Sequence, residues 1–109
     1  MENGYVYIAR AKNGDVKVGK SINYRARMKN HENTSRGGIK LVAVIKADNY
    51  SHLETFIHNK LKGLGLEIWN EWYKNEELVL RTIIDFMKGH GEIFGAYEIY
   101  FTSPKSQAG

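Results

Sequence analysis

The sequence of 109 residues contains no cysteine. This absence excludes disulfide bonds, thiolate metal sites and cysteine nucleophiles, and it fits a reducing cytosol. Long hydrophobic runs are also missing, since none approaches the roughly 20 residues that a membrane-spanning helix needs. The first residues, Met-Glu-Asn-Gly-Tyr, lack the basic and apolar segments of a signal peptide. We therefore expect a soluble, cytoplasmic protein that does not bind membranes.

Positive charge is concentrated in the first part of the chain. Residues 1–46 contain ten Lys or Arg against three acidic residues, whereas residues 47–109 contain six against nine. Basic clusters supply most of the non-specific affinity for nucleic acid, but a basic half can equally be a solvated surface. Charge alone leaves both interpretations open.

The residue pattern predicts one α+β domain over residues 1–101 and a disordered tail over 102–109. We expect a small antiparallel three-stranded central sheet flanked by helices, in the order β-β-α-β-α-(β)-α-β. The aromatic residues Trp69, Trp72 and Tyr73 are expected in the core, with base stacking as the alternative. Strands are expected over 4–11, 16–19 and 38–47, helices over 24–31, 51–62 and 75–88, an extended segment over 67–73 and a short strand over 97–101.

Helix periodicity and end signals support the two longer helices. Their apolar faces are expected at Leu53, Phe56, Ile57 and Leu61, and at Leu80, Ile83, Ile84 and Met87. The side chain of Asn75 is suited to cap the later helix, and the glycines at 63 and 65 are suited to end the earlier one.

Several short motifs follow one another across residues 4–74. They read Tyr5-Val6-Tyr7, Lys17-Val18-Gly19, Lys20-Ser21-Ile22-Asn23, Arg27, Leu53-Glu54-Thr55-Phe56-Ile57-His58 and Glu71-Trp72-Tyr73. This series resembles the GIY-YIG nuclease superfamily and is similar to the nuclease domain of UvrC. It looks like a short bacteriophage branch that has K-[IV]-G as its second motif and a later E-W-[FY].

The resemblance implies a metal-dependent endonuclease that hydrolyses phosphodiester bonds with Mg²⁺ or Mn²⁺. It implies nucleic acid as the partner, with DNA favoured over RNA. If the chain is phage-encoded, the expected location is the host bacterial cytoplasm. A homodimer is compatible with these expectations. Carried over by position, the catalytic residues are Tyr7, Lys17, Arg27, His31 and Glu54, with Glu54 also the metal ligand. The nucleic-acid-binding residues are Tyr5, Lys20, Asn23, Arg25 and Lys29.

Two positions depart from the wider family. Tyr5 stands where the first motif has glycine, although Gly4 is adjacent, and Lys17 replaces the tyrosine of the second motif. Because that tyrosine belongs to the family's catalytic cluster, Lys17 keeps a second interpretation open, namely a nucleic-acid-binding module without catalysis. A third is a phage effector that binds a host protein, since a fold does not fix a function.

The candidate residues suit phosphodiester chemistry, but each has a structural alternative. A guanidinium such as that of Arg27 binds two phosphate oxygens, yet it also suits an exposed helix. Glu54 offers oxygen to a hard cation, yet Ser51-x-x-Glu54 is also a capping-box pattern. His31 either donates a proton to the leaving oxygen or interacts with the end of its helix. His58, one turn after Glu54, either shares a metal with it or orients it.

The hairpin loop decides whether Tyr7 and Lys17 can act together. Phenol is a weak base at its reference pKa near 10, so Tyr7 needs nearby cations such as Lys17. A two-residue loop, Asn13-Gly14, places them on opposite faces, whereas a three-residue loop, Asn13-Gly14-Asp15, places them on one face. An active site containing both predicts the three-residue loop.

Overall fold

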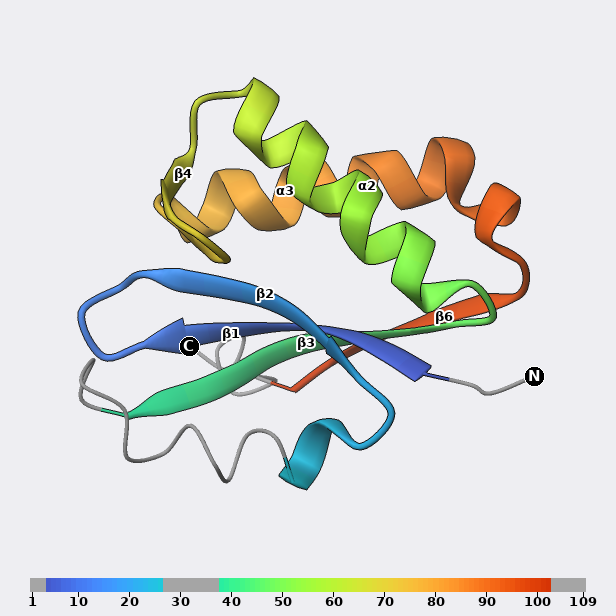
Figure 1. Ribbon diagram of the computed structural model, residues 1–109, viewed down its shortest axis with the longest axis horizontal. Helices are drawn as coiled ribbons and strands as arrows, with labels where there is room; N and C mark the ends of the chain where they lie inside the picture. The colour runs from blue at the N-terminus through green and yellow to red at the C-terminus, as the bar shows by residue number, and fades with distance from the viewer. Residues whose placement is uncertain (1–3, 27–37, 103–109) are drawn as a thin grey trace.

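A computed structural model describes residues 4–26 and 38–102, and two layers are visible in Figure 1, a twisted sheet and a pair of helices on one of its faces. The helices are α2 (Tyr50–Gly63) and α3 (Glu76–His90), followed by a short 3-10 helix (Gly91–Phe94), and residues 24–26 are also helical. The strands are β1 (Gly4–Ala11), β2 (Val16–Ser21), β3 (Ile39–Ala47), β4 (Glu67–Trp69), β5 (Trp72–Tyr73) and β6 (Tyr97–Phe101).

Within residues 4–26 and 38–102, the sheet has six strands in the order β4-β5-β2-β1-β3-β6, and every pairing is antiparallel. The expectation of a small three-stranded sheet is therefore wrong. The central strands were predicted correctly, but β5 extends one edge by pairing Lys17 with Trp72, and β6 extends the other by pairing Ile45 with Ile99. Both pairings join segments more than 50 positions apart, and local patterns carry no information about such partners.

The main core lies between the sheet and the two helices. Alternate residues of the central strands point into it, because successive side chains of a strand face opposite sides. The helices contribute Leu53, Ile57 and Leu61 from α2 and Val79, Ile83, Phe86 and Met87 from α3.

The helix faces differ in part from those expected. Phe56 is 42% exposed and stacks on Phe86 with ring centroids 4.7 Å apart. On α3, Val79 and Phe86 are buried, whereas Leu80 and Ile84 are only half-buried, so the buried stripe is rotated by about one residue. Of the aromatic residues expected in the core, Trp72 and Tyr73 are buried, but Trp69 is 65% exposed.

The predicted helix ends are present. The Asn75 side chain accepts a hydrogen bond from the Leu78 amide at 3.2 Å, with Glu76 and Glu77 in the first turn. Helix α2 ends at Gly63, and Gly65 adopts a φ of +74°, which glycine tolerates.

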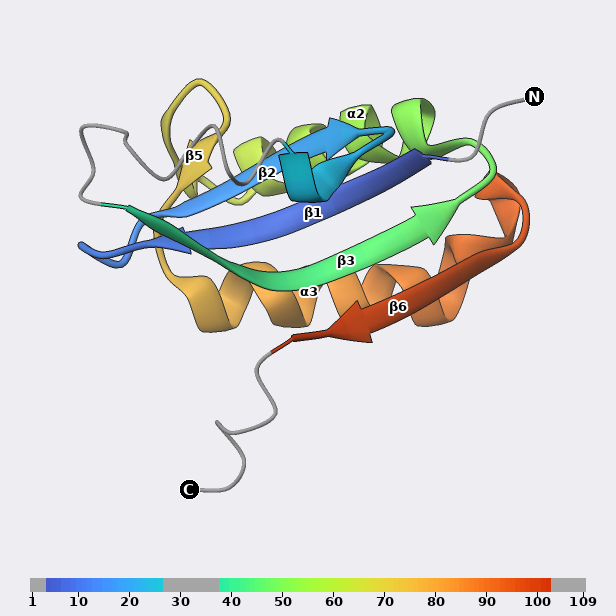
Figure 2. The same cartoon turned by 90° about the horizontal axis from the view of Figure 1, so that it is seen from below.

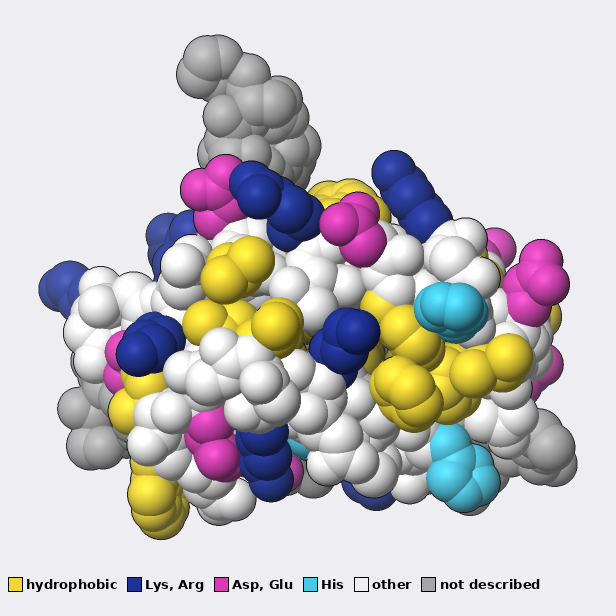
Figure 3. All heavy atoms as spheres, turned by 90° about the horizontal axis from the view of Figure 1, so that it is seen from above, with side chains coloured by type: hydrophobic (Ala, Val, Ile, Leu, Met, Phe, Trp, Pro, Cys, Tyr) yellow, Lys and Arg dark blue, Asp and Glu magenta, His cyan; other side chains and the backbone are white. Residues whose placement is uncertain are grey.

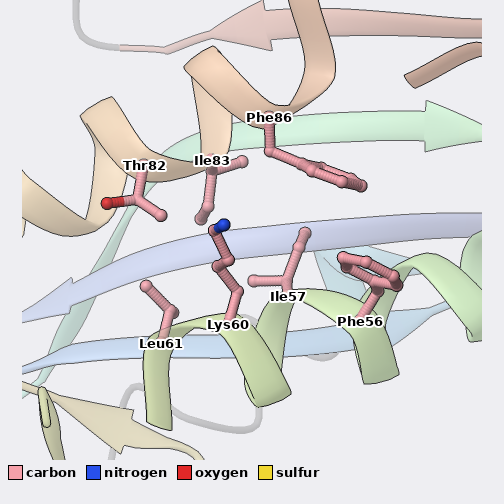
Figure 4. A pocket seen from close by; sticks show the side chains of 7 residues that line it. All are labelled: Phe56, Ile57, Lys60, Leu61, Thr82, Ile83 and Phe86. Carbon is pink, nitrogen blue, oxygen red and sulfur yellow. The ribbon is translucent and has the colours of Figure 1, made fainter. Parts of the chain in front are cut away.

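On the helix-covered face, the hollow between α2 and α3 offers little room for a ligand. The hollow between α2 and α3 holds about 10 Å³, room for no more than one water, and its walls include Phe56, Ile57, Ile83 and Phe86 (Figure 4). Figure 3 shows side chains of both charges interspersed over this face around a hydrophobic patch. Among the described helices, none is long and apolar enough to cross a membrane.

The opposite face of the sheet carries a smaller cluster. Tyr7, Ala9 and Val44 are buried there, and the half-buried residues packed on them are Tyr5, Tyr24, Ile39 and Leu41. The helical residues 24–26 lie over this face (Figure 2). The expected tail begins at Thr102, whose hydroxyl donates to the Leu41 carbonyl at 2.6 Å, and residues 103–109 lie outside the described residues.

Candidate active site

The β1–β2 hairpin places Tyr7 and Lys17 on one face of the sheet. Tyr7 lies opposite Gly19, and Ala9 lies opposite Lys17. The loop has three residues, as a shared face requires, but they are Lys12, Asn13 and Gly14 rather than 13–15, since the Ala11 amide donates to the Asp15 carbonyl at 2.8 Å. The Asn13 side chain accepts from the Asp15 amide at 2.9 Å and so stabilises this turn.

Gly19 makes room for the Tyr7 ring. A Cβ atom built at Gly19 would lie 2.5 Å from the Tyr7 hydroxyl oxygen, far inside van der Waals contact. Tyr7 is only 1% exposed. The glycine of the second motif is therefore required by the tyrosine of the first.

Glu54 does not cap its helix. Helix α2 begins at Tyr50, its N-cap residue is Asn49, and no side chain caps it. The Ser51 hydroxyl instead accepts from the Lys20 ammonium at 2.7 Å. The capping-box interpretation is thus wrong. Glu54 is instead a buried residue, only 7% exposed.

The Glu54 carboxylate faces cationic and imidazole groups. Its Oε2 lies 3.2 Å from His58 Nε2, one turn further along α2, and its Oε1 lies 4.0 Å from Lys20 Nζ on β2. Burying a carboxylate is costly unless it has such partners.

His58 is held by Tyr73 from the neighbouring strand. The Nδ1 atom of His58 hydrogen-bonds with the Tyr73 hydroxyl, and the two rings stack with centroids 5.6 Å apart. Burial raises the pKa of Tyr73 above its ordinary value, and the carboxylates of Glu67, Glu71 and Glu54 raise it further. The phenol therefore stays protonated at neutral pH.

Glu71 completes the cluster from the turn between β4 and β5. Its carbonyl accepts from the Val18 amide at 3.1 Å, and its Oε1 lies 2.9 Å from Lys17 Nζ. Asn70, just before it, has a φ of +50°, the left-handed conformation that asparagine adopts more readily than most residues. One ligand atom from each of Glu54, His58 and Glu71 lies within 4.8 Å of the others. This cluster of three residues, hereafter the Glu-His-Glu cluster, lies where β5 begins beside β2.

The predicted nucleic-acid-binding residues have varied surroundings. The Tyr5 and Tyr24 rings pack edge-to-face with centroids 4.9 Å apart, and the Arg25 guanidinium lies 5.3 Å from the centroid of the Tyr24 ring. The Asn23 side chain accepts from the Ala26 amide at 3.1 Å, a capping bond for the helical segment. Arg27, Lys29 and His31 lie outside the described residues.

Strand alternation directs Lys20 toward the helix-covered face, where it meets Glu54, and directs Lys17 toward the face that holds Tyr7. Glu71, at the edge of β2, connects the two sides, because it pairs with Lys17 and lies within 4.8 Å of Glu54 and His58. The sequence pattern left the role of His58 open and assigned no role in the site to Glu71 or Tyr73. The Glu-x-x-x-His spacing on one helix was a usable signal for His58. The motif Glu71-Trp72-Tyr73 was recognised, but its sequence gives no sign that Glu71 reaches α2.

The fold and cluster define a small α+β domain with a carboxylate–imidazole cluster beside two lysines at the edge of an antiparallel sheet. The chain belongs to the T5orf172 domain family, whose match covers residues 4–88. This phage-associated family is compatible with a nuclease-like or nucleic-acid-binding role. No curated protein and no solved structure matches the chain.

Proposed function

We propose that this protein is a metal-dependent endonuclease that hydrolyses phosphodiester bonds in nucleic acid, with DNA favoured over RNA. The observation that carries the proposal is the buried Glu54 carboxylate, which has no capping role and faces Lys20 and His58. The buried carboxylate offers a cation ligand, and Lys20 beside it offers positive charge for a phosphate. The GIY-YIG-like order of the motifs supports the same assignment.

Each residue has a role that follows from its chemistry. Glu54 would hold Mg²⁺ or Mn²⁺, and such an ion neutralises charge that develops on phosphoryl oxygens. Lys17 and Lys20 attract and stabilise the phosphate, while the Tyr7 hydroxyl orients the attacking water. The water oxygen forms the new bond to phosphorus as the bond to the leaving oxygen breaks, and the proton that this water loses passes to solvent. Arg27 and His31, assigned by resemblance, would stabilise the phosphoryl group and protonate the leaving oxygen.

A binding module without catalysis is the second candidate, because Lys17 stands where the second GIY-YIG motif has a tyrosine. The observation that favours it is the ion pair between Lys17 and Glu71 at 2.9 Å, which occupies the lysine in a structural contact. Such a module would retain salt-sensitive binding to nucleic acid but would not cut it.

The test is cleavage of supercoiled plasmid, labelled single strands and RNA, with Mg²⁺, Mn²⁺ or chelator. Glu54→Gln keeps the size of the side chain and removes its charge, so we expect cleavage to fall at least about a hundredfold. The control is Glu77→Gln on α3, which alters only an exposed pair with Arg81. Cleavage that survives Glu54→Gln or chelation would overturn the proposal, and binding without any cleavage would establish the second candidate.

A further inference from the structure

We infer that the Glu-His-Glu cluster is a three-ligand site that binds a divalent first-row transition-metal ion in preference to Mg²⁺. The ligands are the carboxylates of Glu54 and Glu71 and the Nε2 atom of His58. The inference rests on the proposed function in one respect, since it concerns the same Glu54. It goes further by adding two ligands from other positions and by naming the class of ion.

The spacing of the donor atoms suits a single ion. Nitrogen and oxygen donors bind such ions at about 2.1 Å, so two donors of one ion lie at most about 4.2 Å apart. The three donor atoms lie within 4.8 Å of one another, and one pair, Glu54 Oε2 and His58 Nε2, is already at 3.2 Å. Small rotations of the side chains would bring all three to bonding distance.

Rigid elements hold the ligands in place. Glu54 and His58 are one turn apart on the same face of α2. Glu71 is tied to β2 by the hydrogen bond from the Val18 amide to its carbonyl at 3.1 Å. Placing ligands on anchored elements reduces the entropy lost when they bind an ion.

Tyr73 supplies the outer partner that a metal-binding histidine needs. Ligating histidines commonly hydrogen-bond through their other ring nitrogen, and this contact fixes the orientation of the ring. The buried Tyr73 hydroxyl contacts His58 Nδ1 and leaves Nε2 directed at Glu54. Tyr73 is thus a positioning residue for the ligand.

The two carboxylates of the cluster repel each other, and the lysines beside them offset this repulsion unequally. Two carboxylates, one buried and one half-buried, converge here, and like charges at this distance repel. Lys17 pairs with Glu71 at 2.9 Å, whereas Lys20 is 4.0 Å from Glu54. A divalent ion between the carboxylates would neutralise both of them.

The imidazole determines which ion is favoured. Mg²⁺ prefers oxygen donors and retains several waters, whereas nitrogen ligands bind first-row transition metals with affinities that rise from Mn²⁺ to Cu²⁺. A set of two carboxylates and one imidazole therefore favours Mn²⁺, Co²⁺ or Zn²⁺ over Mg²⁺.

The experiment is calorimetric titration of the full chain with Mn²⁺, Zn²⁺ and Mg²⁺, without nucleic acid. Wild type should bind one Mn²⁺ or Zn²⁺ ion more tightly than Mg²⁺, and His58→Gln and Glu71→Gln should each weaken Mn²⁺ and Zn²⁺ binding at least tenfold. The matched controls, His52→Gln on the exposed side of α2 and Glu77→Gln, should leave binding unchanged. Circular dichroism checks that each variant folds.

The outcomes separate this inference from the nuclease proposal. If Glu54→Gln abolishes binding while His58→Gln and Glu71→Gln leave it unchanged, Glu54 binds the ion without the other two, and the three-ligand site is refuted. Absence of binding in wild type, tighter binding of Mg²⁺, or an equal loss in the controls also refutes it. Three-ligand binding without cleavage of any substrate would support the site and overturn the nuclease.

Discussion

Position 19 shows how a missing side chain shapes the site. The Tyr7 ring occupies the space in which any β-carbon of residue 19 would lie. Two motifs that are separate in the sequence therefore form one contact in space. The Tyr7 ring packs directly against the backbone of β2 at Gly19.

Gly19→Ala should displace the Tyr7 ring. We expect the free energy of unfolding to fall by about 1–3 kcal/mol, because the added methyl overpacks a buried contact. Urea denaturation followed by circular dichroism measures this change. Any cleavage activity should fall with it, since the ring moves away from β2.

Gly89→Ala is the matched control. Nothing lies within 4 Å of a Cβ at this position near the end of α3. Alanine favours helix over glycine, so we expect a gain of about 0.5–1 kcal/mol. If both variants changed stability equally, the steric account of Gly19 would be wrong.

The individual site residues were predictable only where the chemistry is local. The hairpin sequence reduced the relation of Tyr7 and Lys17 to two cases, because strand alternation makes the loop length decide whether they share a face, and the three-residue loop in the structure is the case that the active-site hypothesis predicted. The burial of Glu54 did not follow, since the same residues also fit a capping box. Glu71 reaches α2 only through the pairing of β5 with β2, which no pattern near position 71 specifies.

The start of α3 depends on Asn75, which has a left-handed φ of +68° and a capping side chain. Asn75→Ala removes the acceptor, and alanine adopts the left-handed conformation less readily than asparagine, so we expect a loss of about 1–2 kcal/mol in the free energy of unfolding. Thermal unfolding measures the loss.

Asn75→Gly distinguishes the two causes. Glycine also lacks the acceptor but tolerates the positive φ, so its loss should be clearly smaller than that of alanine. Equal losses in both variants would show that the hydrogen bond alone matters.

The longer helices were predictable from the sequence. The short strands were predicted as extended segments, but their positions in the sheet were not. Hydrophobic periodicity over 14 or 15 residues identified α2 and α3 to within about two residues. The strand β5 has two residues, too few to show a period. The position of β6 at the sheet edge depends on its partner β3, a tertiary contact.

The whole sheet extends beyond the family match, which ends at residue 88. Strand β6 pairs with β3 from Ala43↔Phe101 to Ala47↔Tyr97, and the buried Phe94 precedes it. The Tyr97 hydroxyl also donates to the Met87 carbonyl at 3.0 Å. The folding unit is therefore longer than the part that defines the family.

A chain cut after residue 88 should fail to form a stable monomer. The cut exposes the edge of β3, and exposed edges pair with other chains. Size-exclusion chromatography and circular dichroism should show aggregation or loss of structure. A chain cut after Thr102 keeps every described strand and should remain folded, and a stable 88-residue monomer would refute this account.

The long reach between Lys17 and Glu71, 54 positions apart, also has a kinetic consequence. Local hairpin contacts close cheaply, whereas distant contacts carry the entropy of a long loop. We therefore expect Glu71 to join the edge of β2 late in folding. An ion bound there would stabilise a contact that the transition state lacks. It would therefore slow unfolding and leave the folding rate almost unaltered.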